Sequence, residues 1–381
     1  MKKQAKKGFC AALALSLLAV LLLSFASCGN GYDASSMIYI GASGPLTGEA
    51  ATYGVSVQKG AALAVEQINA AGGLNGIKFF FNMLDDQATA TQASTNYDSL
   101  MDAGMQVSIG AVTTDSCKAF AEKAVKDNLF YITPSASAAE VIAGKPNGYR
   151  VCFSDPQQGE IAADYIAEHD YSEVKVGVIY NTDDAYSKGI YEAFAARMAE
   201  KQISVNARPF DNDHKTDFSA QVEALKDCDV IFLPMYYGEA TLIASKAADK
   251  GCNAVLFGSD GFDGLADVLA DKVKNKIQYI TPFDADSTED NVKRFVAAYK
   301  EKYGETPNQF AADGYDAIMA IFEALKSAGV NSATLSATEL CQKIAGVLSS
   351  DDFELNGVTG KMSWDADGVP TKAPLVKEIK R

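Results

Sequence analysis

Two loops of small, hydroxylated residues could together bind a carboxylate. The first, Gly110–Ser116, joins a short apolar run to an amphipathic stretch, which predicts a strand followed by a helix. Backbone N–H groups at a helix start are unpaired and favour anions, and the hydroxyls of Thr113, Thr114 and Ser116 add donors there. These hydroxyls could instead serve only as caps of that helix. The second loop, Thr133–Ser137, follows the next apolar run and favours the anion site.

One carboxylate, Asp260, is placed to bind an ammonium group. It follows the apolar run Val255–Gly258, a predicted strand, and ligands of parallel sheets lie beyond the ends of the strands. The alternative is a surface aspartate in a turn. All five arginines fall outside the two hydroxylated loops, so no arginine clamp is expected; they are Arg150, Arg197, Arg208, Arg294 and Arg381.

Four aromatic residues in loops or at predicted helix starts could form an apolar wall, and they are Tyr53, Tyr186, Tyr236 and Phe310. Such rings can hold an aliphatic or small aromatic side chain and partly cover an ammonium. They could also simply pack against neighbouring loops. Tyr237 is an alternative to Tyr236, because the sequence does not fix the register there.

Catalytic and cofactor signatures are missing from the sequence. The two histidines, His169 and His214, have no serine or cysteine elbow nearby, and there is no phosphate-binding glycine loop and no C-x-x-C pair. The run Asp365–Gly368 resembles the start of a calcium loop but lacks its further ligands, so it is read as a tight turn. We expect neither enzymatic activity nor a metal or cofactor.

The candidate residues must be positioned by alternating strands and helices. The stretch Met37–Gly73 reads as strand, loop and Ala-rich helix with a glycine C-cap, and similar pairs follow it. The pattern restarts after Ser154, which predicts a second α/β lobe. Late helices from Asn291 need a sheet to cover, so the chain should return to the first lobe near residues 281–283.

With a last crossing close to Trp364, the chain divides into four parts. We expect a signal peptide over 1–27, a linker over 28–36, a first lobe of 37–154 plus 283–364, and a second lobe of 155–282 plus 365–381. Three crossings between the lobes would make a hinge.

The first 27 residues are typical of a secretory leader. They hold four lysines and the apolar run Phe9–Phe25, and the run before Cys28 resembles a lipobox, which predicts lipidation of Cys28. Plain cleavage near Ala26 is the alternative. We therefore expect an extracytoplasmic bacterial protein held on the cell membrane by a lipid. Its mature part has 30 basic and 49 acidic residues, which disfavours nucleic-acid binding.

Five cysteines follow Cys28, so at least one thiol stays unpaired within the chain. Cys228 and Cys252 precede the predicted strands Val230–Leu233 and Val255–Gly258 by nearly equal spacings. Neighbouring strands lie within disulfide reach, which makes a Cys228–Cys252 bridge our hypothesis.

Several markers, taken in order, resemble the type I periplasmic binding proteins, and most closely the branched-chain amino-acid (Leu/Ile/Val) receptors of ABC importers. They are Gly41–Gly48, Gln67–Gly76, Asp85-Asp86, Gly110–Thr114, Thr133–Ser137, Tyr186, Gly258–Asp260 and Gly314–Asp316. The resemblance covers nearly all of residues 38–380. It implies two doubly wound parallel-sheet lobes that close on a ligand, and a monomer that docks on an ABC permease.

The resemblance also implies roles for the candidate residues. Thr114 and Ser137 would bind the ligand's α-carboxylate through their hydroxyls, with Ser135 contributing its backbone, and Asp260 stands where the family often has glutamate. The expected binding set is Tyr53, Val112, Thr113, Thr114, Ser135, Ala136, Ser137, Tyr186, Tyr236, Asp260 and Phe310. An apolar amino acid, branched-chain or related, is the expected ligand. The alternative is another small amphiphile, such as an amide, an aromatic acid or a short peptide.

Overall fold

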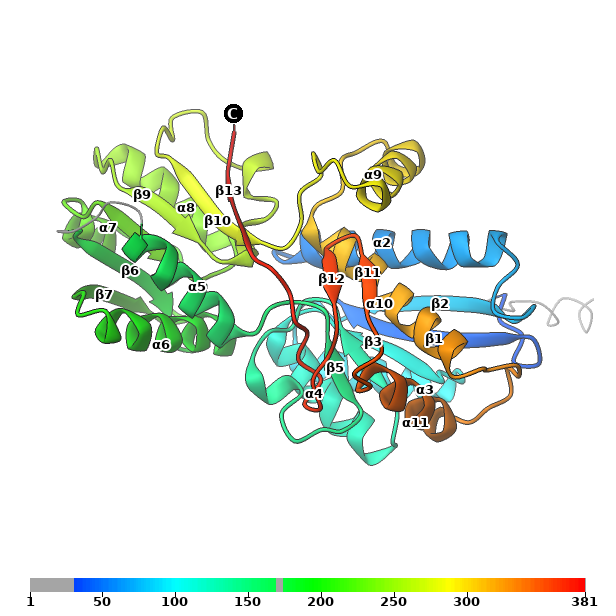
Figure 1. The fold of residues 1–381 in the computed structure, drawn as a ribbon. Coiled ribbons are helices and arrows are strands. Elements are labelled where there is room, and N and C mark those ends of the chain that lie inside the picture. Colours follow the sequence, from blue (N-terminus) through cyan, green and yellow to red (C-terminus); the bar gives the residue numbers. More distant parts are fainter. Residues whose placement is uncertain (1–30, 169–173, 381) are drawn as a thin grey trace, which may run out of the picture.

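Two sheets, each with helices on both faces, lie side by side in this computed structural model, which describes residues 31–168 and 174–380 (Figure 1). The first sheet is wholly parallel, in the order β2-β1-β3-β4-β5. Its strands are β1 Met37–Gly44, β2 Lys78–Asp85, β3 Val107–Ala111, β4 Tyr131–Thr133 and β5 Gly148–Arg150.

Alternate residues of β1 explain why helices cover both faces of this sheet. Ile38 and Ile40 join one apolar cluster and Tyr39 joins another, because successive side chains of a strand point to opposite faces. On the first face lie α2 Ala51–Ala70, α10 Gln309–Ser327 and α11 Ala337–Leu348. On the second lie α3 Ala90–Asp102 and α4 Thr114–Lys126. We call this assembly the first lobe; it also carries α9 Asp290–Tyr303 and the hairpin of β11 Leu355–Gly357 and β12 Gly360–Met362.

The second lobe repeats this plan with six strands in the order β13-β10-β9-β8-β6-β7. Its parallel strands are β6 Val176–Asn181, β7 Val205–Phe210, β8 Val230–Leu233, β9 Val255–Gly258 and β10 Ile277–Thr281, and β13 Leu375–Glu378 is added antiparallel to β10. Helices α5 Asp155–Glu168 and α6 Ala185–Glu200 cover one face, and α7 Ser219–Leu225 and α8 Tyr237–Asp249 cover the other. The predicted α/β fold of two parallel-sheet lobes is confirmed.

The chain passes between the lobes three times (Figure 1): after β5, after β10 and before β13. The third passage comes later than the sequence suggested. The Trp364 indole donates to Arg150 O at 2.7 Å, and Lys372 Nζ still donates to Val151 O at 2.7 Å. The chain therefore leaves the first lobe between Lys372 and Leu375, and the expected boundary at Trp364 is wrong because these contacts hold 365–372 on the first lobe.

The predicted Cys228–Cys252 disulfide is wrong for this structure, in which both thiols are free. Val230 pairs with Val255 across β8 and β9, so the same register places Cys228 level with Asn253 rather than with Cys252. The predictions for the leader and for Cys28 concern residues outside the described ranges. Among the helices within those ranges, none is both long and apolar enough to cross a membrane.

The packing of α2 on α10 depends on Gly60. A Cβ built at Gly60 would lie 1.8 Å from the carbonyl oxygen of Ala311, a backbone atom that cannot simply move aside. Gly60→Ala should lower the free energy of unfolding by about 1–3 kcal/mol through overpacking. The matched control is Gly346→Ala in α11, where no atom lies within 4 Å of the added Cβ. It should raise stability by about 0.5–1 kcal/mol. Urea unfolding of both variants measures the contrast, and equal effects would contradict this packing.

Candidate ligand-binding site

A small cavity lies between the lobes at the carboxyl ends of both sheets. In each sheet the first strand pairs on both sides, β1 with β2 and β3, and β6 with β7 and β8. Ligands of open parallel sheets bind outside such points, where the strand order reverses. The residues lining the cavity are Tyr53, Val112, Thr113, Thr114, Ser135, Tyr186, Tyr236, Asp260, Gly261 and Phe310. Its volume of ≈ 10 Å³ holds about one water molecule, so the lobes are closed here.

The first-lobe side of the cavity is the start of helix α4. The helix begins at Thr114, two residues before the predicted Ser116, and Thr113 is its N-cap residue. The Thr113 side chain makes no capping hydrogen bond, and its buried Oγ1 has no partner among the described residues. A buried hydroxyl without a partner costs free energy, which a ligand oxygen could recover. The site therefore offers an anion the helix N-terminus and an unused hydroxyl.

The second hydroxylated loop contributes less than the sequence suggested. Ser135 lines the cavity, but Ala136 and Ser137 do not. The carbonyl of Ser137 accepts hydrogen bonds from the Arg150 guanidinium and from the backbone N–H of Asp155, and its hydroxyl lies beside the Asp155 carboxyl. These contacts turn Ser137 toward the hinge. Arg150 is fully buried behind the loop and does not reach the cavity, as expected for all five arginines.

Asp260 forms the second-lobe side of the cavity and is held by a set of short hydrogen bonds. The Tyr186 hydroxyl donates to Asp260 Oδ1 at 2.6 Å, lies 2.6 Å from Ser259 Oγ, and accepts from the Gly261 N–H at 3.0 Å. The Asp260 N–H donates to Gln158 Oε1 at 3.0 Å. The carboxylate is thus fixed in orientation by neutral partners alone.

Burial makes the ionised form of Asp260 costly. Only 4% of the residue is exposed, and desolvation raises the pKa of its carboxyl from 3.8 to about 6, although the Tyr186 and Gln158 hydrogen bonds lower it. No ion pair is formed by Asp260 within the described part of the chain. A cation placed in the cavity would remove this cost.

The aromatic residues form one connected wall. The Tyr53 ring lies 4.7 Å from Phe310 and 5.5 Å from Tyr236, and Tyr236 stacks on Tyr186 at 4.9 Å with an interplanar angle of 12°. Tyr236, not Tyr237, lines the cavity, which settles the register that the sequence left open. Tyr237 instead donates its backbone N–H to the Tyr53 hydroxyl at 2.9 Å.

Several contacts across the lobes involve residues that sequence reasoning missed. The Tyr53 hydroxyl donates to Gly261 O at 2.8 Å, and the Gln309 N–H at the start of α10 donates to Asp263 Oδ2 at 2.6 Å. Gln158 supports Asp260 from α5. Backbone groups such as Gly261 O and the Gln309 N–H, and a single glutamine side chain such as that of Gln158, leave no recognisable pattern in a single sequence, so no signal identified these residues.

Comparison with known proteins places this geometry in a family. A family model described as periplasmic binding protein matches residues 37–373. The chain belongs to the periplasmic binding protein family. The predicted resemblance to its type I members is confirmed by this match and by the relatives below.

Among its relatives, this periplasmic binding protein is 27% identical to the Leu/Ile/Val-binding protein homolog 1 of Brucella abortus, over 350 residues covering 89% of both chains. It is 30% identical to the branched-chain amino acid transporter substrate binding protein LivJ from Streptococcus pneumoniae, solved in complex with isoleucine, with a TM-score of 0.78 over 89% of this chain and 95% of that one. An R. palustris solute binding protein in complex with benzoate is 19% identical with a TM-score of 0.79 over 90% and 93% of the two chains, which shows the shared fold alone.

The raised pKa of Asp260 gives a pH dependence of folding. The folded protein binds the Asp260 proton more tightly than the unfolded chain, so this group's contribution to stability is present below about pH 4 and is lost as the pH rises through about 6. The loss should be about 3 kcal/mol, for a shift of about two pKa units. Without ligand, Asp260→Asn should lose correspondingly less stability between pH 4 and pH 8 than the parent.

Denaturant unfolding at several pH values measures this difference. The substitution also removes the Asp260 charge that raises the pKa of Asp155 and of Asp313, which changes the profile in the same direction. Thr114→Val removes no titrating group and is the control, which should follow the parent profile. If stability depends on pH in the same way in Asp260→Asn and in the parent, burial does not raise the pKa of Asp260.

Proposed function

We propose that this protein is the extracytoplasmic receptor of an ABC importer and binds an apolar α-amino acid, branched-chain or related, between its lobes. The proposal rests on one observation: a group of hydrogen-bond donors suited to an anion and a carboxylate suited to a cation face the same cavity from opposite lobes. An unpartnered Thr113 hydroxyl and the N-terminus of α4 face it from the first lobe, and the buried carboxylate of Asp260 faces it from the second. An α-amino acid has the matching pair of charges on one carbon atom.

The aromatic wall accounts for the side chain of the ligand. Tyr53, Tyr186, Tyr236 and Phe310 surround the cavity with rings rather than with charged groups, which favours an aliphatic or small aromatic side chain. The names of the relatives point the same way, since the chain is similar along most of its length to a Leu/Ile/Val-binding protein homolog and to a protein bound to isoleucine.

Binding requires the closed arrangement to open. A cavity of ≈ 10 Å³ cannot hold an amino acid, so the ligand must enter while the lobes are apart and closure must follow. The three chain passages between the lobes form the natural hinge. Contacts between the lobes such as Tyr53–Gly261 form here without a ligand, so an approach of the lobes belongs to the protein's own equilibrium. With an amino acid between them, the lobes would close to a slightly wider separation than in this arrangement.

The location and the partner are part of the same proposal. A secretory leader with a lipidated Cys28 would keep the receptor at the outer side of the cell membrane, where an ABC permease could accept the closed, ligand-loaded form as a monomer. Tyr32 already packs against Tyr39 and Phe80 of the first lobe, so only the few residues between Cys28 and Tyr32 would tether the lobe to the lipid.

A carboxylic acid without an ammonium group, such as an aromatic acid, is the alternative ligand. The structure gives it a poor fit, because Asp260 would remain buried without a cation and a second carboxylate would join it in the same cavity. We therefore favour the amino acid.

Two substitutions test the two ends of the ligand one at a time: Asp260→Asn tests the contact with its ammonium, and Thr114→Val tests the contact with its carboxylate. Asp260→Asn should weaken leucine binding by about 2–5 kcal/mol, roughly thirtyfold or more, because the ligand's ammonium loses its only charged partner. Thr114→Val should cost about 1–3 kcal/mol, since the backbone donors of the helix remain. Titration calorimetry at pH 8 with leucine, isoleucine and valine measures both, with folding checked by circular dichroism. Parental affinity for every amino acid in Asp260→Asn would refute the assignment.

A further inference from the structure

A second and much larger cavity adjoins the amino-acid site, and no role has been assigned to it above. Its volume is ≈ 510 Å³, within the range of small-molecule sites. It lies mostly in the second lobe, beyond the carboxyl ends of β6, β7 and β8, and reaches the first lobe at Glu49 and Ala88. Tyr236 lines both cavities. We call this cavity the acidic chamber.

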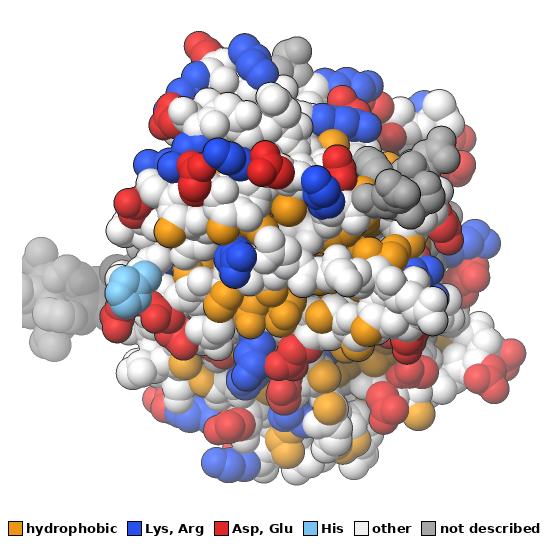
Figure 2. Space-filling view, turned by 90° about the vertical axis from the view of Figure 1, so that its left-hand side faces the viewer, with side chains coloured by type: hydrophobic (Ala, Val, Ile, Leu, Met, Phe, Trp, Pro, Cys, Tyr) orange, Lys and Arg blue, Asp and Glu red, His pale blue; other side chains and the backbone are white. Residues whose placement is uncertain are grey.

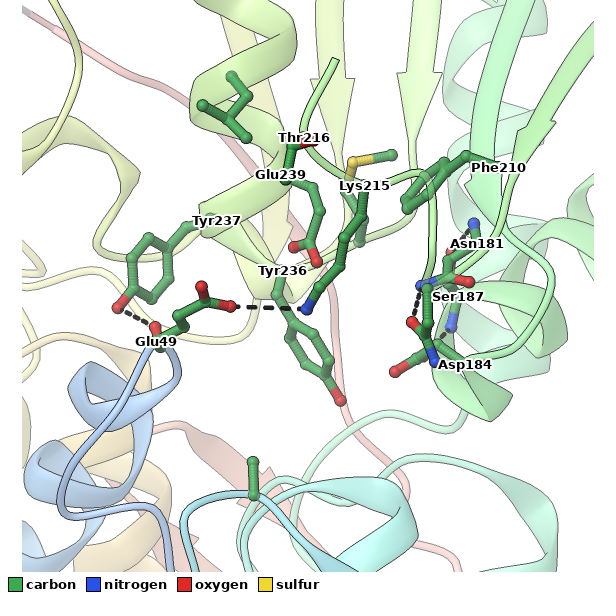
Figure 3. Close-up of a pocket in the computed structure, with 15 residues that line it drawn as sticks. Glu49, Asn181, Asp184, Ser187, Phe210, Lys215, Thr216, Tyr236, Tyr237 and Glu239 are labelled. Atoms are coloured by element: carbon green, nitrogen blue, oxygen red, sulfur yellow. Dashed lines mark hydrogen bonds and ion pairs between the residues drawn. The ribbon is translucent and has the colours of Figure 1, made fainter. Parts of the chain in front are cut away.

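The charged side chains of the acidic chamber are unbalanced. Glu49, Asp184 and Glu239 face it with carboxylates, and Lys215 is the single cation lining it (Figure 3). The Lys215 ammonium lies 3.5 Å from Glu49 Oε2, and the side chain of Glu49 is 88% exposed. The ion pair of Lys215 is therefore made with the most exposed of the three carboxylates. Neither Asp184 nor Glu239 forms an ion pair with any residue in the described ranges. Two carboxylates inside the chamber therefore lack a counterion.

These two carboxylates are half-buried. Asp184 Oδ1 accepts the Ser187 N–H at 2.8 Å as the cap of α6, and the Glu239 carboxylate accepts its own backbone N–H. Desolvation raises the pKa of Asp184 to about 6, and the charge of Glu239 raises it further. Desolvation also raises the pKa of Glu239, although its own backbone N–H and the charge of Lys215 lower it. A cation entering the chamber would relieve both desolvation and mutual repulsion.

The rest of the lining suits an organic cation better than a metal ion. Phe210, Met235, Tyr236 and Tyr237 supply apolar and aromatic surface, and Leu242 at the rim is 44% exposed, although it is a large aliphatic residue. Aromatic faces attract ammonium groups. The Tyr236 hydroxyl, directed into the space between the lobes (Figure 3), forms no hydrogen bond with the described residues and can accept one.

The excess of carboxylates is a feature of the acidic chamber and not of the whole surface of the second lobe. Figure 2, which faces the second lobe, shows lysines and acids mixed over the surface without one sign prevailing. General solubility therefore does not account for Asp184 and Glu239 facing an enclosed space.

We propose that the acidic chamber is a binding subsite for an alkylammonium group, with Glu239 and Asp184 as its anions and Tyr236 and Phe210 as its walls. The amine can be a separate molecule, or the far end of a longer ligand whose α-amino acid end lies at Asp260. The inference for a separate amine does not depend on the proposed function, because the chamber has its own carboxylates; the inference for a longer ligand rests on it.

n-Hexylammonium is the probe for this proposal, measured by titration calorimetry or ligand-observed NMR on the full-length protein at pH 8 and low salt. It should bind at least fivefold more tightly than 1-hexanol, which has the same chain without the charge. Glu239→Gln and Asp184→Asn, which keeps a capping side chain for α6, should each weaken n-hexylammonium binding at least fivefold. Both variants should keep the parental affinity for leucine.

Asp260→Asn is the matched control, since an amine bound in the amino-acid cavity would need that carboxylate. Its affinity for n-hexylammonium should stay within twofold of the parent. Unchanged affinity in Glu239→Gln and Asp184→Asn, or loss of binding in Asp260→Asn, would overturn the proposal. Failure of leucine to bind any form would refute the proposed function without touching this one.

Saturating leucine separates the two sources of the amine. If n-hexylammonium still binds with the same affinity, the chamber takes a second molecule. If an amino acid with a terminal amine on a long side chain binds, and both Glu239→Gln and Asp260→Asn weaken it, the chamber takes the far end of one ligand. Either result supports the subsite. It is contradicted if neither Glu239→Gln nor Asp184→Asn weakens the binding of n-hexylammonium or of the amino acid with a terminal amine.

Discussion

The buried carboxylate of Asp260 is the constraint on which the rest of the site depends. An ionised group that is 4% exposed and has no counterion among the described residues destabilises the closed protein. The hydroxyl of Tyr186, the side chain of Gln158 and the Gly261 N–H offset part of that cost. The orientation of the carboxylate is therefore strongly fixed while its charge is left unsatisfied. A receptor gains from this arrangement, because the missing counterion can come from the ligand and closure is then stabilised by what it encloses.

The two lobes reach this arrangement by the same topology used twice. Each sheet has its first strand between its second and third, and the loops at that point come together only because the lobes face one another. Thr113 and Ser135 then face the cavity from one sheet, and Tyr186 and Asp260 face it from the other. Neither lobe holds a complete site alone, so recognition and closure depend on the same contacts.

The sequence predicted well those features that depend on order along the chain. Short apolar runs followed by glycine or hydroxylated residues located the strand ends, and nine of the eleven expected residues line the cavity. It failed where side-chain direction depends on distant contacts. Ser137 is turned to the hinge by Arg150, and Trp364 stays with the first lobe because its indole binds the carbonyl of the same arginine. The acidic chamber could not be foreseen, since Asp184, Lys215 and Glu239 belong to three separate loops and helix starts.

Truncated analogues of leucine test the central claim most directly. Calorimetric titration of the parent protein at pH 8 would compare leucine with 4-methylpentanoic acid, which lacks the ammonium, and 3-methylbutylamine, which lacks the carboxylate. If one carboxylate-binding face and one ammonium-binding face enclose the ligand, both analogues should bind at least a hundredfold more weakly than leucine, because each leaves one buried polar end of the site unpaired. Binding of 4-methylpentanoic acid as tight as that of leucine would contradict the account, since Asp260 would then have no part in recognising the ligand.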